Sequence, residues 1–275
     1  PRTPARWRIR AFPNKYAALD PHPPGLPNPD GPLFLAIPGE GSHEVLVETP
    51  VHNRFPAVRT EEEMDLVVQA YRERYVDLMS RSSNHYVLVF KNHGGEAGTS
   101  LEHPHSQIIA VPVIPERVGR MGKIAEEHHR RTGQCIQCQL VREEIRLETR
   151  VVDQDEDFVV FHPFAAAHEA ETWIVPLDHQ ASFGSLSKAA VTRLGLALSR
   201  TLHRLSAGFG DPDFNYAIHS APRGQEGKPY IHWYLQLVPC LSKVAGFELG
   251  SGIYINTASP EETALAMRQA PAAPA

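Results

Sequence analysis

Residues 86–113 read YVLVFKNHGGEAGTSLEHPHSQIIAVPV, and this stretch decides how the rest of the chain is interpreted. Residues 86–90 and 107–113 are short runs rich in β-branched and aromatic residues on either side of a polar loop, which predicts two strands. Because side chains alternate along a strand, His103, His105 and Gln107 are predicted to share one face of the incoming strand. Three polar groups should therefore converge at one place.

The loop before this strand, residues 92–100, is rich in glycine and hydroxyl side chains. Backbone N–H groups of such a loop can approach phosphate oxygens closely, because glycine has no Cβ. Each feature alone is interpreted more simply as a solvated turn followed by an edge strand with surface histidines. The loop and the three polar side chains together favour a phosphate-binding site.

A long amphipathic helix is predicted upstream of this stretch. Thr60 and Glu63 form a capping box at its start. Apolar residues then recur at helical spacing, namely Met64, Val67, Val68, Tyr71, Tyr75 and Leu78. Strand-like segments are predicted before the helix at residues 7–19, 33–37 and 44–48, with a proline-rich loop at residues 21–32.

The same order of elements recurs downstream of a charged, helix-like connection at residues 116–150. A second helix is predicted from Ser187, and strands are predicted at residues 158–161, 171–176, 214–219 and 231–238. His52 and His179 each follow a strand and a proline. A second histidine comes 51 residues later in the first half (His103) and 53 residues later in the second (His232).

This repetition predicts an α+β fold of two tandem lobes, each an antiparallel sheet with a packed helix. We expect the first lobe at residues 1–120 and the second at residues 121–275. The chain of 275 residues is long enough for either one large or two ordinary domains, and no apolar run approaches the roughly 20 residues that span a membrane. We therefore expect a protein that works without a membrane.

Charge and cysteine content narrow the classes of partner and compartment. A net charge of −5 argues against binding to nucleic acid polymers, although a local phosphate pocket would not change that sum. Three cysteines, two of them in Cys135-Ile136-Gln137-Cys138, argue against a disulfide framework and favour a reduced, cytoplasmic location.

Several of these motifs together resemble the galactose-1-phosphate uridylyltransferase family of the histidine-triad superfamily, which includes the related nucleoside-diphosphate-hexose phosphorylases. The matching segments are residues 12–16, 48–53, 103–107, 230–239 and 246–248, so the resemblance covers almost the whole chain. It implies that both lobes are histidine-triad-like.

The resemblance also implies a reaction. His105 is then the nucleophile, because a neutral imidazole has an unshared electron pair near pH 7 and forms a labile phosphoramidate. The enzyme would move a nucleoside monophosphate from a nucleoside-diphosphate sugar to hexose 1-phosphate, with UDP-glucose and galactose 1-phosphate as the default pair. Gln107 stands where histidine-triad hydrolases have a third histidine, and an amide cannot shuttle a proton to water.

Binding residues follow from family positions. The nucleotide and phosphate pocket would be lined by Asn14, Lys15, Asn92, Gly98, Thr99 and Ser100. Gly246, Phe247 and Glu248 would reach the sugar, across the interface of a homodimer as in the family.

A separate cluster has the chemistry of a closed structural zinc site, with two thiolates and two imidazoles from Cys135, Cys138, His179 and His232. Family members often carry a further Cys-x-x-Cys upstream of the Asn14 region that joins the equivalents of His52 and His103 on a second metal. A second site with His52 and His103 is compatible with this sequence if residues precede Pro1, but it is not part of the leading prediction. Tyr234 replaces the nucleophile in the second lobe, which should therefore be catalytically silent.

Three alternatives stay open on the sequence. A phosphorylase would use inorganic phosphate as acceptor, and strands with a serine at the position of Ser106 occur in that group. A hydrolase of nucleotides is disfavoured by Gln107. A non-catalytic nucleotide-binding protein is the third.

Overall fold

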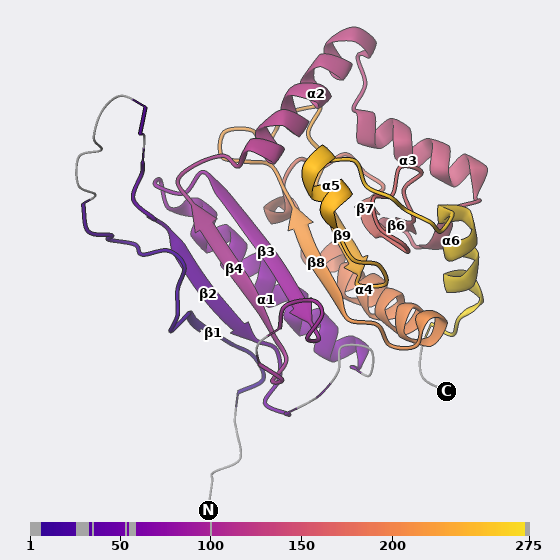
Figure 1. The fold of residues 1–275 in the computed structure, drawn as a ribbon, viewed down its shortest axis with the longest axis horizontal. Helices are drawn as coiled ribbons and strands as arrows, with labels where there is room; N and C mark the ends of the chain where they lie inside the picture. Colours follow the sequence, from indigo (N-terminus) through magenta and orange to yellow (C-terminus); the bar gives the residue numbers. More distant parts are fainter. Residues whose placement is uncertain are drawn as a thin grey trace, which may run out of the picture.

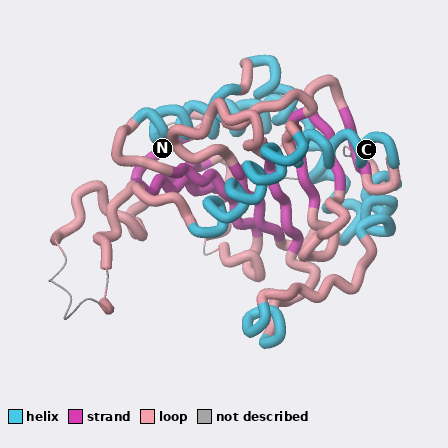
Figure 2. Tube along the Cα trace, turned by 90° about the horizontal axis from the view of Figure 1, so that it is seen from above, coloured by secondary structure: helices cyan, strands magenta, loops and turns pink. Residues whose placement is uncertain are grey.

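The computed structural model describes residues 7–25, 33–34, 36–52, 54, 59–99 and 101–272. Within these residues the chain builds one nine-stranded sheet with the strand order β1-β2-β4-β3-β8-β9-β7-β6-β5 (Figure 1). Its neighbouring strands pair antiparallel, and helices lie on both sides of the strand layer (Figure 2). The predicted α+β class is confirmed.

Both halves contribute a similar set of strands. The first supplies β1 (Arg10–Pro13), β2 (Ser42–Val47), β3 (Tyr86–His93) and β4 (His105–Val111). The second supplies β5 (Val151–Gln154), β6 (Phe158–Phe161), β7 (Thr172–Pro176), β8 (Phe214–His219) and β9 (Tyr234–Pro239). Strands β3 and β8 pair with each other, so a hydrogen-bonded ladder joins the halves into one sheet. The boundary near residue 120 stays a prediction.

Two long helices, α1 (Glu61–Ser80) and α4 (Lys188–Phe209), lie side by side behind the sheet (Figure 1). The predicted capping box of Thr60 and Glu63 begins α1, and Ser187 caps α4. Gly195 permits the close approach of the two helices, because a Cβ there would lie 2.9 Å from the Cα of Asp65. The periodic apolar residues predicted for α1 are all buried in the shared core.

The connection contains α2 (Glu116–Thr132) and α3 (Ile136–Leu147), separated at Gly133, whose positive φ ends α2. Two further helices near the C-terminus, α5 (Gly246–Ser251) and α6 (Pro260–Gln269), were not predicted. None of the helices in the described residues is long and apolar enough to span a membrane.

The predicted strand at residues 33–37 is wrong for the residues that the structure describes there. Leu33, Phe34 and Ile37 lie outside any strand and are largely exposed, so this apolar run has no sheet face to bury against. His103 also lies just before β4 rather than within it, so the strand alternation places only His105 and Gln107 on one face.

Candidate functional site

A cavity of about 500 Å³ opens beside the start of β4. Its lining includes Asn92, Gly94, Thr99, His103, His105 and Asp213. Four of these, Asn92, Thr99, His103 and His105, were singled out from the sequence. A cavity of about 620 Å³ between α2 and residues 222–230 has none of the predicted catalytic residues in its lining.

His105 is held in one tautomer by its own backbone. Its Nδ1 lies 2.8 Å from the carbonyl oxygen of His103. Because a carbonyl oxygen only accepts, Nδ1 carries the proton and donates. The unshared electron pair of the neutral ring is therefore on Nε2. This is the arrangement that a nucleophilic imidazole needs.

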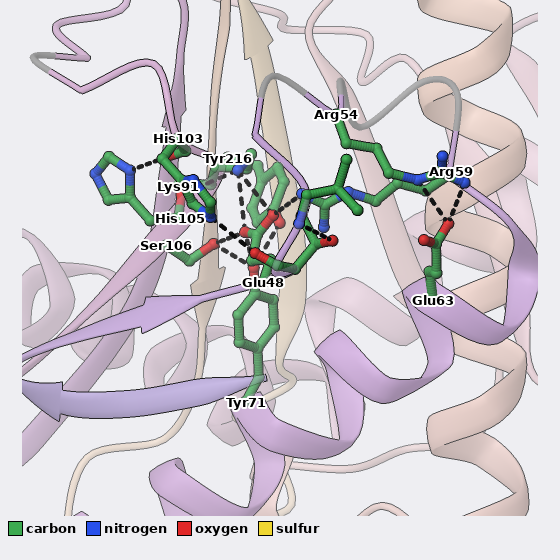
Figure 3. Close-up of polar contacts among 12 residues, drawn as sticks. Glu48, Arg54, Arg59, Glu63, Tyr71, Lys91, His103, His105, Ser106 and Tyr216 are labelled. Carbon is green, nitrogen blue, oxygen red and sulfur yellow. Dashed lines mark hydrogen bonds and ion pairs between the residues drawn. The ribbon is translucent and has the colours of Figure 1, made fainter. Parts of the chain in front are cut away.

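Behind this strand lies a buried polar cluster, on the side away from the His105 ring (Figure 3). Lys91 donates hydrogen bonds to both carboxylate oxygens of Glu48 at 3.0 Å and to the backbone carbonyl of His105 at 2.9 Å. Arg59 forms an ion pair with Glu48 at 2.6 Å, and the Ser106 hydroxyl donates to Glu48. The cluster thus fixes the backbone of the strand that carries His105.

Charges within the cluster do not cancel. Burial raises the pKa of the Glu48 carboxyl, but the charges of Arg59 and Lys91 and the Ser106 hydrogen bond outweigh it and hold that pKa well below its ordinary value. Burial lowers the pKa of Lys91 to about 8, although the Glu48 charge opposes this shift. At neutral pH two cations therefore face one carboxylate, and the cluster leaves a net positive charge behind His105.

Gln107 lies two residues beyond His105 on the same face of β4. Its Oε1 lies 2.7 Å from Nε2 of His43, a buried residue of β2. No hydrogen bond from the Gln107 amide nitrogen to another described residue is present, and this nitrogen remains free to donate to a ligand.

The glycine-containing loop folds against β8. Gly94 has a φ of +87°, and a Cβ there would collide with the carboxylate of Asp213, so only glycine fits. Asp213 accepts a hydrogen bond from the backbone N–H of Glu96 at 2.7 Å, and Asn215 donates to Asn92 Oδ1 at 2.9 Å. These contacts give the loop a defined shape beside the cavity.

Thr99 has a buried hydroxyl without a hydrogen-bond partner in the described structure. Gly98 lies beside it with a positive φ of +84°. A buried hydroxyl without a partner is costly, so a ligand oxygen at this place would satisfy it. Ser100, the last predicted residue of this loop, lies outside the described residues.

The other predicted binding residues lie at different distances from the cavity. Asn14 is close to the site, since its Nδ2 lies 3.1 Å from Nε2 of His43. Lys15 is exposed, with its Nζ over the ring of Tyr16. Gly246, Phe247 and Glu248 begin α5, which lies in front of β8 and β9, and they do not line the cavity of their own chain (Figure 1).

The predicted Cys/His cluster forms in the second half. It consists of Cys135, Cys138, His179 and His232. Each residue offers one ligand atom, and these four atoms all lie within 4.8 Å of one another. His179 donates from Nε2 to the Lys228 carbonyl at 3.2 Å, which leaves Nδ1 free to face Cys138. A hydrogen bond from the Cys138 thiol lowers the pKa of the Cys135 thiol. The cluster can bind a metal ion.

A second histidine pair lies beside the cavity. Nδ1 of His52 and Nδ1 of His103 are 3.3 Å apart, and Nε2 of His103 donates to the Thr49 carbonyl at 2.8 Å. The ring centroids are 5.5 Å apart, close to the 5.3 Å between His179 and His232. Within the described residues the pair has no cysteine beside it.

Tyr234 is the first residue of β9, as His105 is the first residue of β4. Gln236 lies two residues after Tyr234, as Gln107 lies two residues after His105. The Tyr234 ring lies between those of Trp173 at 4.5 Å and His219 at 4.8 Å. Burial raises its pKa to about 12, so the phenol stays protonated at neutral pH. The second lobe thus presents no imidazole at this position.

Sequence reasoning missed His43 and the cluster of Glu48, Arg59 and Lys91. A signal existed for the cluster, because Lys91 interrupts an apolar strand and Glu48 follows another. Neither charge would be placed beside a core without a partner. No comparable signal marked His43, whose role depends on strand pairing.

Comparison with known proteins agrees with this geometry. A family model described as "Galactose-1-phosphate uridyl transferase, N-terminal domain" matches residues 4–115. The chain is 35% identical to ADP-glucose phosphorylase of Arabidopsis thaliana over 96% of its own length and 74% of that protein. It is 28% identical to galactose-1-phosphate uridylyltransferase of Thermotoga maritima over 97% of its length and 86% of that protein.

A solved structure described as uridylyltransferase is similar throughout. It superposes with a TM-score of 0.90 at 31% identity, covering 98% of this chain and 87% of the other. The relation therefore extends across both lobes, beyond residues 4–115 that the family model matches.

Proposed function

Because this chain belongs to the galactose-1-phosphate uridylyltransferase family, we propose that it transfers a nucleoside monophosphate from a nucleoside-diphosphate sugar to hexose 1-phosphate. The observation that carries the proposal is the tautomer of His105, whose Nδ1 donates to the His103 carbonyl and whose Nε2 keeps the unshared pair. UDP-glucose and galactose 1-phosphate are the leading substrates.

The reaction has two displacements. Nε2 of His105 attacks the α-phosphorus, and the bond from that phosphorus to the bridging oxygen breaks, which releases hexose 1-phosphate. A phosphate oxygen of the acceptor then attacks the same phosphorus, and the P–N bond breaks. Leaving group and acceptor are both already ionised, so no general base is required, and catalysis depends on positioning and charge stabilisation.

Groups around His105 match these needs. The ring becomes cationic when Nε2 bonds to phosphorus, and the His103 carbonyl that accepts from Nδ1 stabilises that charge. Gln107 is proposed to donate from its amide nitrogen to a phosphoryl oxygen. The net positive cluster behind the strand favours an anionic ligand in front of it.

We assign the pocket as follows. Asn14, Lys15, Asn92, Gly98, Thr99 and Ser100 are proposed to contact the nucleotide and its phosphates. Gly246, Phe247 and Glu248 are proposed to reach the sugar of a neighbouring protomer in a homodimer, since Phe247 is 54% exposed and these residues do not line their own cavity. A cytoplasmic location is consistent with three free cysteines.

Zinc is the metal that best fits the donor set of Cys135, Cys138, His179 and His232, with two sulfurs and two imidazole nitrogens. Its proposed role is structural, because all four positions are supplied by protein. His52 and His103 are proposed as half of a second site. Two imidazole nitrogens on one tetrahedral zinc lie about 3.3 Å apart, as these two Nδ1 atoms do.

A phosphorylase is the second candidate. The chain shares 35% identity with the Arabidopsis ADP-glucose phosphorylase but 28% with the Thermotoga uridylyltransferase. The chemistry at His105 would be the same, and only the acceptor would change to inorganic phosphate.

One experiment tests both candidates. The protein is incubated with base-labelled UDP-glucose or ADP-glucose and quenched in alkali, and label on His105 is sought by mass spectrometry, with His105→Ala as the control. Discharge of the label by galactose 1-phosphate supports the transferase, whereas discharge by phosphate supports the phosphorylase. Release of free monophosphate without acceptor would indicate a hydrolase. Nucleotide binding without any label would refute the enzymatic proposal.

A further inference from the structure

His43 contacts the proposed catalytic strand but has no role in the reaction described so far. It lies on β2, where its neighbour Val45 pairs directly with Gln107 of β4. His43 therefore stands diagonal to Gln107 on the same face of the sheet, within reach of its side chain. Its side chain is buried, with 9% of the residue exposed.

The protonation of the His43 ring follows from a backbone contact. The backbone N–H of Ala18 donates to Nδ1 at 3.1 Å, so Nδ1 carries no proton. In the neutral ring the proton must then be on Nε2, which lies 2.7 Å from Gln107 Oε1. The amide nitrogen of Asn14 also lies 3.1 Å from this Nε2, but because both nitrogens then carry protons this longer contact is not a hydrogen bond.

This donor fixes which end of the Gln107 amide faces the ligand. Oε1 accepts from His43, so the NH2 group is the end that remains. A reversed amide would set two N–H donors against each other at His43. It would also turn the carbonyl oxygen towards an anionic phosphate, which is repulsive.

In the second lobe the amide nitrogen of the equivalent glutamine is already hydrogen-bonded. Gln236 occupies the position of Gln107, and its Oε1 accepts from His219 at 2.9 Å. Its amide nitrogen donates to Glu171 at 2.7 Å, so both ends of this amide are satisfied within the protein. Glu171 is the counterpart of His43. Trp173 of β7 pairs with Gln236 as Val45 of β2 pairs with Gln107. Glu171 lies two residues before Trp173, and His43 lies two residues before Val45.

We propose that His43 is a positioning residue, whose Nε2–H orients the Gln107 amide so that both of its N–H groups are presented to the phosphoryl group transferred by His105. This role rests on the proposed nucleotidyl transfer. It predicts that the effect of His43 passes entirely through Gln107.

A kinetic cycle tests this dependence. The rate of His105 labelling at saturating nucleotide sugar is measured in His43→Leu, Gln107→Ala and the double variant. Because loss of one preorganised donor to a reacting group costs about 100-fold to 1,000-fold, a misoriented donor should slow labelling by about 10-fold to 100-fold. His43→Leu should add nothing in the Gln107→Ala background.

His43→Gln is the rescue variant, because its amide nitrogen stands near the place of Nε2 and can donate. We expect it to label within about threefold of the unmodified protein, a difference well under 1 kcal/mol. Labelling by His43→Leu at the rate of the unmodified protein would overturn the proposal. So would equal slowing in both Gln107 backgrounds, which would indicate a general effect on folding.

Nitrogen NMR of 15N-histidine-labelled protein gives a readout that does not need activity. We expect the His43 ring with a protonated Nε2 and a bare Nδ1, and a change of the Nε2 signal in Gln107→Ala. A protonated Nδ1 would refute the positioning role even in an active enzyme. If the unmodified protein takes no label while the NMR tautomer is as expected, the proposed reaction fails and the orientation of Gln107 stands.

Discussion

Lys91→Met tests how much the buried cluster of Glu48, Arg59 and Lys91 stabilises the fold around the strand that carries His105. Met keeps the length of the side chain but removes its charge and its three hydrogen bonds, two to Glu48 and one to the His105 carbonyl. Removing one partner of a buried ion pair costs roughly 3–5 kcal/mol. Arg59 remains 2.6 Å from Glu48, so we expect the lower end, about 3 kcal/mol.

The assay is unfolding at pH 7, by heat and by urea. For a protein of this size about 1 kcal/mol shifts Tm by roughly 2–4 °C, so Lys91→Met should melt about 6–12 °C lower. Lys188→Met is the matched control, because Lys188 is exposed at the first position of α4. It should stay within about 0.5 kcal/mol of the unmodified protein.

A double-variant cycle then separates the ion pair from simple packing. In Glu48→Gln the charge of Lys91 loses its partner, whereas Glu48→Gln with Lys91→Met removes both charges. We expect the double variant to be more stable than the sum of the two single effects by about 1–3 kcal/mol. Strict additivity, or a Lys91→Met protein as stable as Lys188→Met, would refute the reasoning.

Three further outcomes are expected. Burial lowers the pKa of His162 from 6.5 to about 3. As the pH falls, the unfolded chain therefore binds a proton at this histidine before the folded protein does. The free energy of unfolding should fall below pH 6.5 by up to about 1.4 kcal/mol per pH unit. Urea unfolding between pH 7 and pH 4 should show a flatter slope in His162→Asn but not in the exposed His22→Asn; equal slopes would contradict this. Metal analysis should find bound zinc in Cys240→Ser but strongly reduced zinc in Cys138→Ser, and unchanged content in both would remove the proposed site. Gln107→Glu should label His105 at least about 100-fold more slowly, because a carboxylate replaces the amide donor, and labelling at the original rate would exclude the proposed phosphate contact.

How much of the fold could be predicted depended on how strongly each segment is patterned. Helix α1 was found because its capping box and apolar spacing agree, and β6 and β8 were predicted at their observed bounds. Helix α5 has only six residues and none of them is buried, so its sequence has no apolar periodicity that would predict a helix. The run at residues 33–37 has strand composition but no sheet face to cover, and local pattern alone cannot show that.

The site divides in the same way. His105, Gln107, Cys135 and Cys138 could be singled out because they lie in short motifs, and His179 and His232 because the two halves repeat the same order of elements. His43 and Lys91 act through contacts between β2, β3 and β4, which only the register of the sheet establishes. A histidine in a strand is compatible with many roles, and the Ala18 N–H that decides its protonation comes from a loop 25 residues away.

The two lobes show how the proposed catalytic strand β4 differs from its counterpart β9 on the same scaffold. In both, a glutamine lies two residues after the first residue of the strand, and a histidine donates to its carbonyl oxygen. In the second lobe the Gln236 amide nitrogen donates to the Glu171 carboxylate, and Tyr234, packed against Trp173, occupies the position equivalent to His105. A histidine at position 234 alone would therefore face a glutamine without a free donor and a nearby negative charge. The proposed reaction in the first lobe needs the unused N–H groups of Gln107 as well as Nε2 of His105. His43 on β2 orients the first, and the His103 carbonyl that accepts from Nδ1 of His105 fixes the second.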